Sequence, residues 1–178
     1  GTDPTRAWFG DALDVQRDSA RQRVQVTSQT GVGIAYCRAH PNAAIGGASD
    51  IAYCRLLEPV LDTAVLPPAL AACEHDALSV GQRVTLVGLG LEPRTTTVGS
   101  KLVAQGPLLQ KSTVLVAGDS DVGTCGGDSG GPLFVRADEI NGAWPDEWRL
   151  GGILSSGNQS ELCGEGRYVD VFAGLAWL

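Results

Sequence analysis

Residues 124–134, TCGGDSGGPLF, place Ser129 and Asp128 among four glycines. Glycine tolerates positive φ angles and lets the backbone approach a ligand closely. That freedom suits a serine nucleophile, because the neighbouring N–H groups must point at a developing oxyanion; the donors here would be the N–H groups of Gly127 and Ser129. The alternative is a glycine-rich hairpin with an incidental serine. An activated serine also needs a base, usually a histidine, and the chain contains two histidines.

The elements around this loop are predicted to be short strands. Runs of β-branched, aromatic and other apolar residues end in turn residues such as Gly, Asp or Ser. These runs are RVQVTS, GVGIAYCRAH, DIAYCRLL, QRVTLVGLG, STVLVAGD, GPLFVRAD and WRLGGILSSG. Residues 58–81 are rich in Pro and Ala and predict a linker with one helical turn near residues 68–73. Many short strands without βα alternation predict an all-β barrel or sandwich.

Length and composition limit the classes of function. The 178 residues fit one ordinary domain or two small ones, and a hydrophobic content of 43% is enough for a core. The formal net charge of −7 argues against nucleic acid as a partner. No apolar run approaches the roughly 18 residues that span a bilayer, so no membrane partner is expected. The first residues lack a basic segment followed by an apolar one, so they do not read as a signal peptide.

The cysteine count is odd. The five cysteines are Cys37, Cys54, Cys73, Cys125 and Cys163. No C-x-x-C pair occurs, which argues against a structural zinc site. Because the number of cysteines is odd, at least one thiol is unpaired or bound to another chain. Cys37 and Cys54 lie on strands expected to be neighbours, so they either pair or stay as core thiols, and Cys73 in the linker is a candidate for a link to a second chain.

Five segments together resemble the chymotrypsin/trypsin-like serine proteases, in the order of that family. SDIAYCRLLEPV resembles the segment that carries the catalytic aspartate, QRVTLVGLG the strand that opens the second barrel, and CGGDSGGPL the nucleophile loop. GGILSSGN resembles the substrate-binding strand, and CGEGRYVDVFAGLAWL the last strand and the start of the terminal helix. Leu89 and Ser156 stand where the family usually has Trp. The resemblance runs from about Val24 to Leu178.

The resemblance implies an all-β fold, a chymotrypsin-like double Greek-key β-barrel with a short C-terminal helix. Residues 1–57 would form the C-terminal half of the first barrel, which is therefore incomplete in this chain. Residues 58–81 would be the interbarrel linker. Residues 82–178 would form the second barrel, with the nucleophile loop and the start of the C-terminal helix.

The resemblance also assigns roles. Ser129 is the implied nucleophile, Asp50 the aspartate that orients the base, and the N–H groups of Gly127 and Ser129 the oxyanion hole. Asp128 matches the aspartate that pairs with an N-terminal ammonium freed by zymogen activation; the alternative is a turn residue bonded to its own backbone. Cys125 and Cys163 are implied to form a disulfide, the alternative being two buried thiols.

The implied substrate pocket consists of Gly123, Thr124, Ser155, Ser156, Gly157 and Gly166. Trypsin-like members carry an aspartate at the position of Gly123, where it pairs with Arg or Lys. A pocket floored by glycine and threonine should prefer an uncharged side chain. Glu165 could reach the rim of the pocket, and otherwise is a solvated loop charge.

Neither histidine fits the base of this family. In the chymotrypsin-type order the histidine precedes the aspartate by about 45 residues, whereas His40 precedes Asp50 by 10 residues and His75 follows it. YCRAHPN resembles the turn before the aspartate segment, which makes His40 a turn residue fixed by the next proline. His75 is expected to be a solvated linker residue. Since WFGDALD resembles the strand after the histidine loop, the base is expected just before Gly1.

The sequence thus predicts a serine endopeptidase that hydrolyses peptide bonds through an acyl-enzyme, as the larger chain of a cleaved two-chain protease. Its partners would be a polypeptide substrate and the N-terminal fragment of the same protease, which would cover the exposed edges of a half-barrel. No metal or organic cofactor is expected. The alternatives are a non-catalytic, protease-like binding or scaffold protein and a dormant zymogen fragment. The expected location is secreted or periplasmic, and a cytoplasmic location would predict reduced or strained cysteines.

Overall fold

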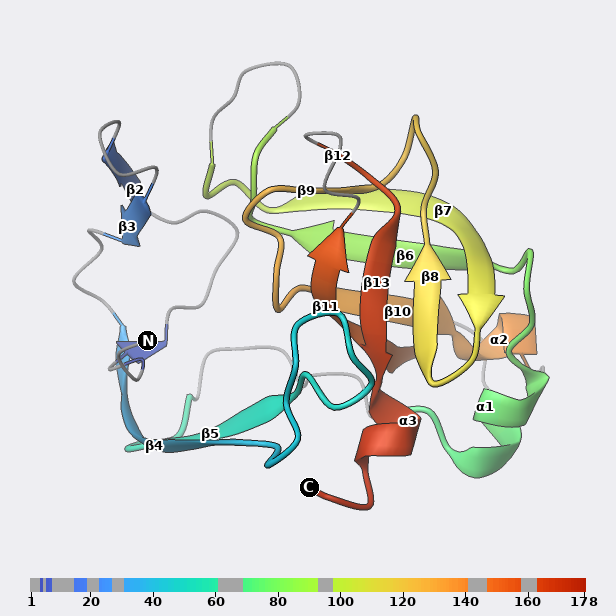
Figure 1. Ribbon diagram of the computed structural model, residues 1–178, viewed down its shortest axis with the longest axis horizontal. Coiled ribbons are helices and arrows are strands. Elements are labelled where there is room, and N and C mark those ends of the chain that lie inside the picture. Colours follow the sequence, from blue (N-terminus) through green and yellow to red (C-terminus); the bar gives the residue numbers. More distant parts are fainter. Residues whose placement is uncertain are drawn as a thin grey trace.

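A computed structural model describes residues 4, 6–7, 15–18, 23–26, 31–60, 69–92, 98–140, 147–157 and 163–178. Its main body is a closed antiparallel barrel with the strand order β10-β11-β13-β8-β7-β6, on the right of Figure 1. The six strands are β6 (Arg83–Gly88), β7 (Leu102–Lys111), β8 (Val114–Ala117), β10 (Pro132–Arg136), β11 (Trp148–Gly157) and β13 (Gly166–Asp170). Closure removes unpaired strand edges.

The hydrophobic core lies inside this barrel. Most of its members are apolar side chains of the strands that meet inside the barrel, and Leu70, which precedes α1, joins them. They include Leu70, Val84, Leu86, Leu108, Leu115, Leu133, Val135, Leu154 and Tyr168, none more than 5% exposed. The loop that carries Ser129 leads directly into β10, so one of its ends is anchored in the packed barrel.

A separate sheet, with the order β1-β4-β5, lies at the lower left of Figure 1. Its strands are β1 (Arg6–Ala7), β4 (Val32–Ala39) and β5 (Ala52–Leu56). Two further pairs complete the described strands: β2 (Val15–Asp18) with β3 (Arg23–Val26), and β9 (Thr124–Cys125) with β12 (Cys163–Gly164).

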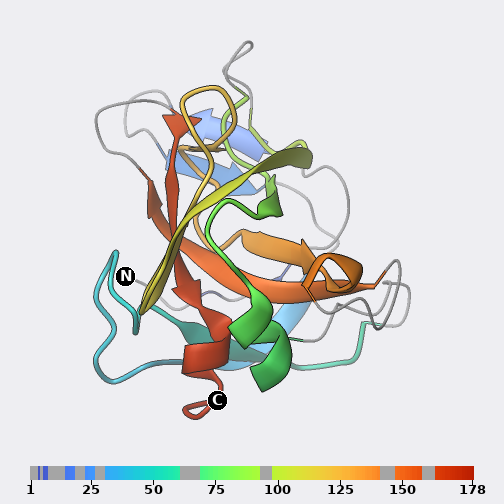
Figure 2. The same ribbon diagram turned by 90° about the vertical axis from the view of Figure 1, so that its right-hand side faces the viewer.

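Among the described residues, three short helices accompany the strands: α1 (Ala72–Ala77), α2 (Ala137–Ile140) and α3 (Val171–Gly174). In α1, Glu74 Oε2 accepts from the backbone N–H of Ala71 at 2.8 Å, and Glu74 Oε1 accepts from Arg149 Nε at 2.9 Å. Lys111 Nζ donates to the carbonyl oxygens of His75 and Leu78 at the end of the helix, which satisfies groups that a helix end leaves unpaired. Figure 2 shows α1 next to α3 beneath the barrel.

The all-β fold class is confirmed, and each of the seven predicted runs contains a strand. β7 was not predicted, because Gly106 and Pro107 interrupt its apolar pattern; Pro107 is tolerated beside a register shift between Leu108 and Gln110. The helical turn forms later than predicted, at α1, and residues 61–68 and 8–14 lie outside the described residues. Domain boundaries at residues 57 and 81 stay a prediction. Among the described residues, no helix is both long and apolar enough to cross a membrane.

Candidate active site

Ser129 lies in the loop between β9 and β10 and is exposed. The φ angles of 96° at Gly127 and 86° at Gly130 favour glycine at both positions. The N–H of Gly130 donates to the carbonyl oxygen of Leu154 at 2.8 Å, which fixes the loop to β11. Within the described part of the chain, the N–H groups of Gly127 and Ser129 have no hydrogen-bond partner. The loop that carries Ser129 therefore has two backbone donors without a partner in the described structure.

The carboxylate of Asp128 is held by two backbone N–H groups. Oδ1 accepts from Gly90 and Oδ2 accepts from Cys125, each at 2.7 Å. A Cβ at Gly88 would lie 1.9 Å from this Oδ1, and a Cβ at Gly90 would lie 2.5 Å from it. The two glycines of the GLG stretch therefore make room for the carboxylate. The bond to Cys125 is a local turn contact, whereas the bond to Gly90 ties the nucleophile loop to the end of β6.

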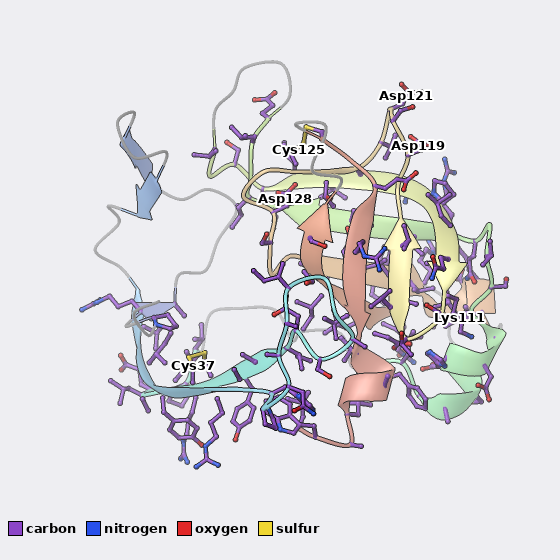
Figure 3. All side chains as sticks on the ribbon, viewed as in Figure 1. Cys37, Lys111, Asp119, Asp121, Cys125 and Asp128 are labelled. Atoms are coloured by element: carbon purple, nitrogen blue, oxygen red, sulfur yellow. A yellow bond between two sulfur atoms is a disulfide. The ribbon has the colours of Figure 1, made fainter. Side chains whose placement is uncertain are left out.

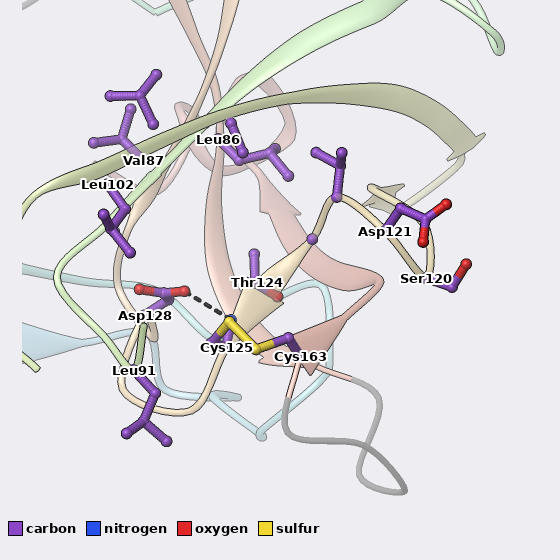
Figure 4. A pocket seen from close by; sticks show the side chains of 15 residues that line it. Leu86, Val87, Leu91, Leu102, Ser120, Asp121, Thr124, Cys125, Asp128 and Cys163 are labelled. Atoms are coloured by element: carbon purple, nitrogen blue, oxygen red, sulfur yellow. Dashed lines mark hydrogen bonds between the residues drawn. A yellow bond between two sulfur atoms is a disulfide. The ribbon is translucent and has the colours of Figure 1, made fainter. Parts of the chain in front are cut away.

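A cavity of about 350 Å³ opens next to Asp128 (Figure 4). Its aliphatic lining includes Leu86, Val87, Leu91 and Leu102, and the disulfide partners Cys125 and Cys163 also line it. Figure 4 shows the carboxylate of Asp128 at this cavity, with its bond to Cys125 drawn as a dashed line. The cavity thus combines an apolar wall with the carboxylates of Asp128 and Asp121.

Two disulfides are present. Cys125–Cys163 joins β9 to β12 beside the nucleophile loop, and Cys37–Cys54 joins β4 to β5. Figure 3 labels Cys37 and Cys125, which show how far apart the two bridges lie. Cys73 is an exposed thiol in α1. The pairing of Cys37 with Cys54, which the sequence left open, is thereby resolved.

Asp50 lies near the end of the loop between β4 and β5, just before the buried Ile51. Its Oδ2 accepts a hydrogen bond from Ser155 Oγ of β11. Ser155 Oγ in turn accepts from the backbone N–H of Gly46 at 2.7 Å. The φ angle of 78° at Gly46 suits glycine at this turn. The aspartate is therefore held in one orientation by a side chain of the barrel.

Asp50 and Ser129 line one cavity of about 740 Å³. Ser155, Ser156 and Gly157 of β11 form another part of its wall. A carboxylate and an exposed serine at one cavity, with two donors next to the serine, are three of the parts that a serine–histidine–aspartate mechanism requires. The fourth part is an imidazole between the carboxylate and the serine.

Neither histidine of the chain lines this cavity. His40 follows β4, where its Nδ1 accepts from the backbone N–H of Asn42 at 3.1 Å, as expected for a turn residue. The prediction of a solvated His75 is wrong. Its Nε2 lies 2.7 Å from Asp170 Oδ2, its ring stacks on Phe172 with centroids 4.5 Å apart, and its side chain is 16% exposed. Apolar packing and a buried carboxylate at α3 hold it in place, a long-range contact that the linker sequence does not reveal.

The residues predicted for the substrate pocket are divided between two cavities. Ser155, Ser156 and Gly157 line the cavity of Ser129, whereas Gly123 and Thr124 line the cavity of Asp128. The two groups meet at the Thr124 side chain: a Cβ at Gly157 would lie 3.6 Å from Thr124 Oγ1. The exposed Glu165 lines neither cavity.

Two close contacts leave no room for larger residues at the predicted pocket. A Cβ at Gly123 would lie 2.0 Å from the carbonyl oxygen of Gly164. At Gly166 a Cβ would lie 3.0 Å from Thr124 Oγ1 and 2.7 Å from the buried ring of Tyr168. Burial, and secondarily the charge of Asp128, raises the pKa of Tyr168 well above its ordinary value. Gly123 has no side chain, so no carboxylate stands at this position.

Sequence reasoning missed two contributions to the site. Ser155 was assigned to the substrate pocket, but it also holds Asp50. Gly88 and Gly90 were recognised only as strand-flanking glycines, although their lack of side chains admits the Asp128 carboxylate. The repeated glycine of GLG could have signalled a close approach of another group.

Comparison with known proteins agrees with these features. Residues 6–178 match the family model described as Trypsin. The CLIP domain-containing serine protease B10 of Anopheles gambiae is 32% identical over 145 residues, and the phenoloxidase-activating factor 1 of Holotrichia diomphalia is 30% identical over 146 residues. These alignments cover 72% and 71% of this chain but only 38% of each relative. With the nucleophile-type loop, the barrel and the family match together, the chain belongs to the trypsin family of serine proteases.

Proposed function

We propose that the chain is the larger chain of a two-chain serine endopeptidase. The observation that carries this proposal is the shared cavity of Asp50 and Ser129, with Asp50 held by Ser155. The proposed nucleophile is Ser129, the proposed orienting aspartate is Asp50, and the proposed oxyanion donors are the N–H groups of Gly127 and Ser129.

The proposed reaction is acyl transfer to water. A histidine in the cavity accepts the proton of Ser129 Oγ while this oxygen bonds to the carbonyl carbon of the substrate. The N–H groups of Gly127 and Ser129 stabilise the oxyanion, and Asp50 stabilises the imidazolium. The imidazolium then gives its proton to the leaving amine as the C–N bond breaks. Water repeats both transfers and releases the acid, so no metal or organic cofactor is needed.

The base is proposed to come from a second polypeptide, because neither histidine of this chain lines the cavity. The N-terminal fragment of the same protease is the proposed source. Its first ammonium group would pair with Asp128, and the apolar cavity of about 350 Å³ would accept the first side chain. A cation in this place would add a charge partner to a carboxylate that is now held by two N–H groups alone.

The proposed substrate is a polypeptide with an uncharged side chain at the cleavage site. The backbone contact between Gly123 and Gly164 leaves no space for an acidic side chain at residue 123 that could pair with Arg or Lys. The two disulfides favour an oxidising compartment, so the proposed location is secreted or periplasmic.

A fluorophosphonate probe tests the catalytic proposal, because it reacts only with an activated serine. The natively purified protein should be labelled at Ser129, and the Ser129→Ala variant should not. Ser79→Ala, which changes an exposed serine outside both cavities, should keep full labelling. Absence of label on the native protein would favour the second candidate, a non-catalytic binding protein, which the positions of His40 and His75 support.

Intact mass, measured with and without reductant, tests the two-chain proposal. A second polypeptide with a histidine should accompany the chain of 18.5 kDa. If Cys73 forms the link, the two masses should separate only after reduction. A labelled protein that consists of the chain alone would refute the two-chain arrangement, because the base would then have to be one of its own residues.

A further inference from the structure

One face of the β4–β5 hairpin gathers aromatic rings and arginines. Antiparallel pairing sets Tyr36 opposite Arg55 and Arg38 opposite Tyr53. Because side chains alternate along a strand, these four lie on one face and Cys37 and Cys54 lie on the other. In Figure 3, Cys37 lies above the ribbon of β4. We call the opposite side the aromatic–arginine face, which comprises Tyr36, Arg38, Tyr53, Arg55, Trp177 and His40.

Contacts between the rings make this face continuous. The Tyr36 and Tyr53 ring centroids are 6.3 Å apart, and those of Tyr53 and Trp177 are 5.5 Å apart. The ring centroids of His40 and Trp177 are 5.1 Å apart, and Cζ of the Arg38 guanidinium lies 5.6 Å from the centroid of the Tyr36 ring. Such packing limits the motion of each side chain, so a partner that binds here immobilises fewer rotamers.

The charge of this face differs from that of the whole chain. The formal net charge is −7, yet β4 and β5 carry Arg38 and Arg55 and no acidic residue. Both arginines are exposed, and neither has a carboxylate partner within the described residues. Asp50, which precedes the hairpin strand, is bonded to Ser155 of the barrel. Two guanidinium forks are therefore open to an outside anion.

We propose that the aromatic–arginine face is a docking surface for an acidic, extended segment of a partner protein. Guanidinium groups bind carboxylates through two parallel hydrogen bonds. Tyr, Trp and Arg are the residues that dominate binding at protein–protein interfaces. A nucleic acid or sulfated polysaccharide fits less well, because dense phosphate or sulfate needs many basic groups, whereas this face offers two. The matching segment carries a few carboxylates between apolar side chains.

The proposal does not depend on catalysis. It rests on the outer side of the hairpin, and it holds whether Ser129 is a nucleophile or a retired serine. None of the two tyrosines, two arginines and Trp177 lines the cavity shared by Asp50 and Ser129. The face and that cavity therefore use different side chains.

Fluorescence anisotropy with the natively purified protein tests the proposal. The probe is a labelled peptide of alternating Glu and Phe residues, and a peptide of alternating Lys and Phe is its charge control. We expect saturable binding of the acidic peptide only. The double variant Arg38→Gln/Arg55→Gln should weaken it by about tenfold or more, and added salt should weaken it further.

Arg83→Gln is the matched control, because Arg83 is also exposed but lies on β6 of the barrel. It should leave peptide affinity unchanged. Tyr36→Ala, at another exposed position, should weaken binding without a change of charge. Equal affinity of the wild type and the double arginine variant would overturn the proposal, as would the absence of any peptide binding. Binding of heparin through Arg38 and Arg55 without binding of the peptide would also overturn it, in favour of a polysaccharide.

Discussion

The closed barrel and the β1–β4–β5 sheet use strands of similar composition but bury them very differently. All four residues of β8 are buried, whereas β4 and β5 contain no buried residue. Among the described residues before residue 69, Ile51 is the one buried apolar residue. Strands stabilise a fold by burying one face against a second layer. The barrel supplies that layer to itself, and the described part of the sheet does not.

The difference matters because the proposed site spans both regions. Ser129 stands on a loop fixed to the barrel, whereas Asp50 belongs to the hairpin of the open sheet. The hydrogen bonds of Ser155 to Asp50 and Gly46 connect the two regions. A region with few buried contacts opens at low free energy, so the position of Asp50 should depend on this connection.

The largest contrast is expected from removing each disulfide. Cys125–Cys163 closes 38 residues of the barrel, and in the chain-entropy account its loss costs about 4 kcal/mol. Cys37–Cys54 closes 17 residues, which would cost about 3 kcal/mol if the sheet unfolded with the barrel. We expect Cys37→Ala/Cys54→Ala to change the free energy of the main urea unfolding transition by less than about 1 kcal/mol. Cys125→Ala/Cys163→Ala should lower that free energy by the whole amount of about 4 kcal/mol.

Hydrogen exchange provides the control for that comparison. The amides of β4 and β5 should exchange faster in the Cys37→Ala/Cys54→Ala variant while those of β8 stay protected. Equal costs of the two double variants in urea would show one cooperative unit and contradict the contrast.

Truncation of an apolar side chain should also cost more stability in the barrel than in the sheet. Leu133 is fully buried in the barrel, and Leu133→Ala should lower the free energy of unfolding by about 3 kcal/mol through lost transfer energy and a residual cavity. Leu56 of β5 is only partly buried, so Leu56→Ala should cost about 1 kcal/mol or less. Urea denaturation of both variants measures the difference. A cost at Leu56 as large as that at Leu133 would mean that the sheet has a covered face.

The barrel was also the region that the sequence predicted best. β8 is a continuous apolar run, and β6 is apolar apart from Arg83 and Thr85, so local pattern and burial agree in both strands. β7 was missed because Gly106 and Pro107 break that pattern, and it is held by pairing with its neighbours β6 and β8 rather than by its own apolar pattern. Propensity cannot report pairing of this kind.

The candidate site shows the same limit. The glycine pattern around Ser129 predicted a constrained loop, and the motif order led to Asp50. Local sequence could not show that Ser155 binds Asp50 across 105 positions, or that His75 meets Asp170 across 95 positions. The predicted pocket residues failed to surround one cavity because Thr124 lies close to Gly157 and Gly166, a matter of side-chain placement rather than of spacing.

Ser155→Ala should weaken the connection between the regions. It leaves the Asp50 carboxylate and the N–H of Gly46 without their present partner, which should cost about 2 kcal/mol of stability. If the proposed mechanism holds, labelling of Ser129 by a fluorophosphonate should also slow by about tenfold. Ser79→Ala should change neither quantity. Unchanged labelling and stability in Ser155→Ala would show that Asp50 is held by other contacts.

At high pH the barrel should lose stability through its buried Tyr168. Tyr168 stays protonated in the barrel because burial raises its pKa, whereas in the unfolded chain it ionises near its ordinary value of 10.0. The unfolded state therefore releases a proton that the folded state keeps, and stability falls as pH rises above about 10. Tyr168→Phe should remove part of this decline, measured by urea denaturation from pH 8 to 11. Tyr168→Phe lacks only the buried hydroxyl, so an unchanged decline in this variant would mean that Tyr168 does not cause it.

The smallest effect is expected on the barrel surface, at the ion pair of Arg136 and Asp138. The hydrogen bond from Arg136 lowers the pKa of Asp138 below the ordinary value of 3.8. A lowered pKa adds stability above that value and loses it as pH falls through the folded pKa. Because both side chains are about one third exposed, water and salt weaken the pair. Asp138→Asn should thus lower the free energy of unfolding slightly at pH 7, with the difference shrinking as pH falls below 3.8 or as salt is added. The exposed neighbour Glu139, changed to Gln, is the control. A large loss of stability in Asp138→Asn that persists at low pH would contradict this account. It would mean that Asp138 stabilises α2 through hydrogen bonds to the backbone rather than through its charge.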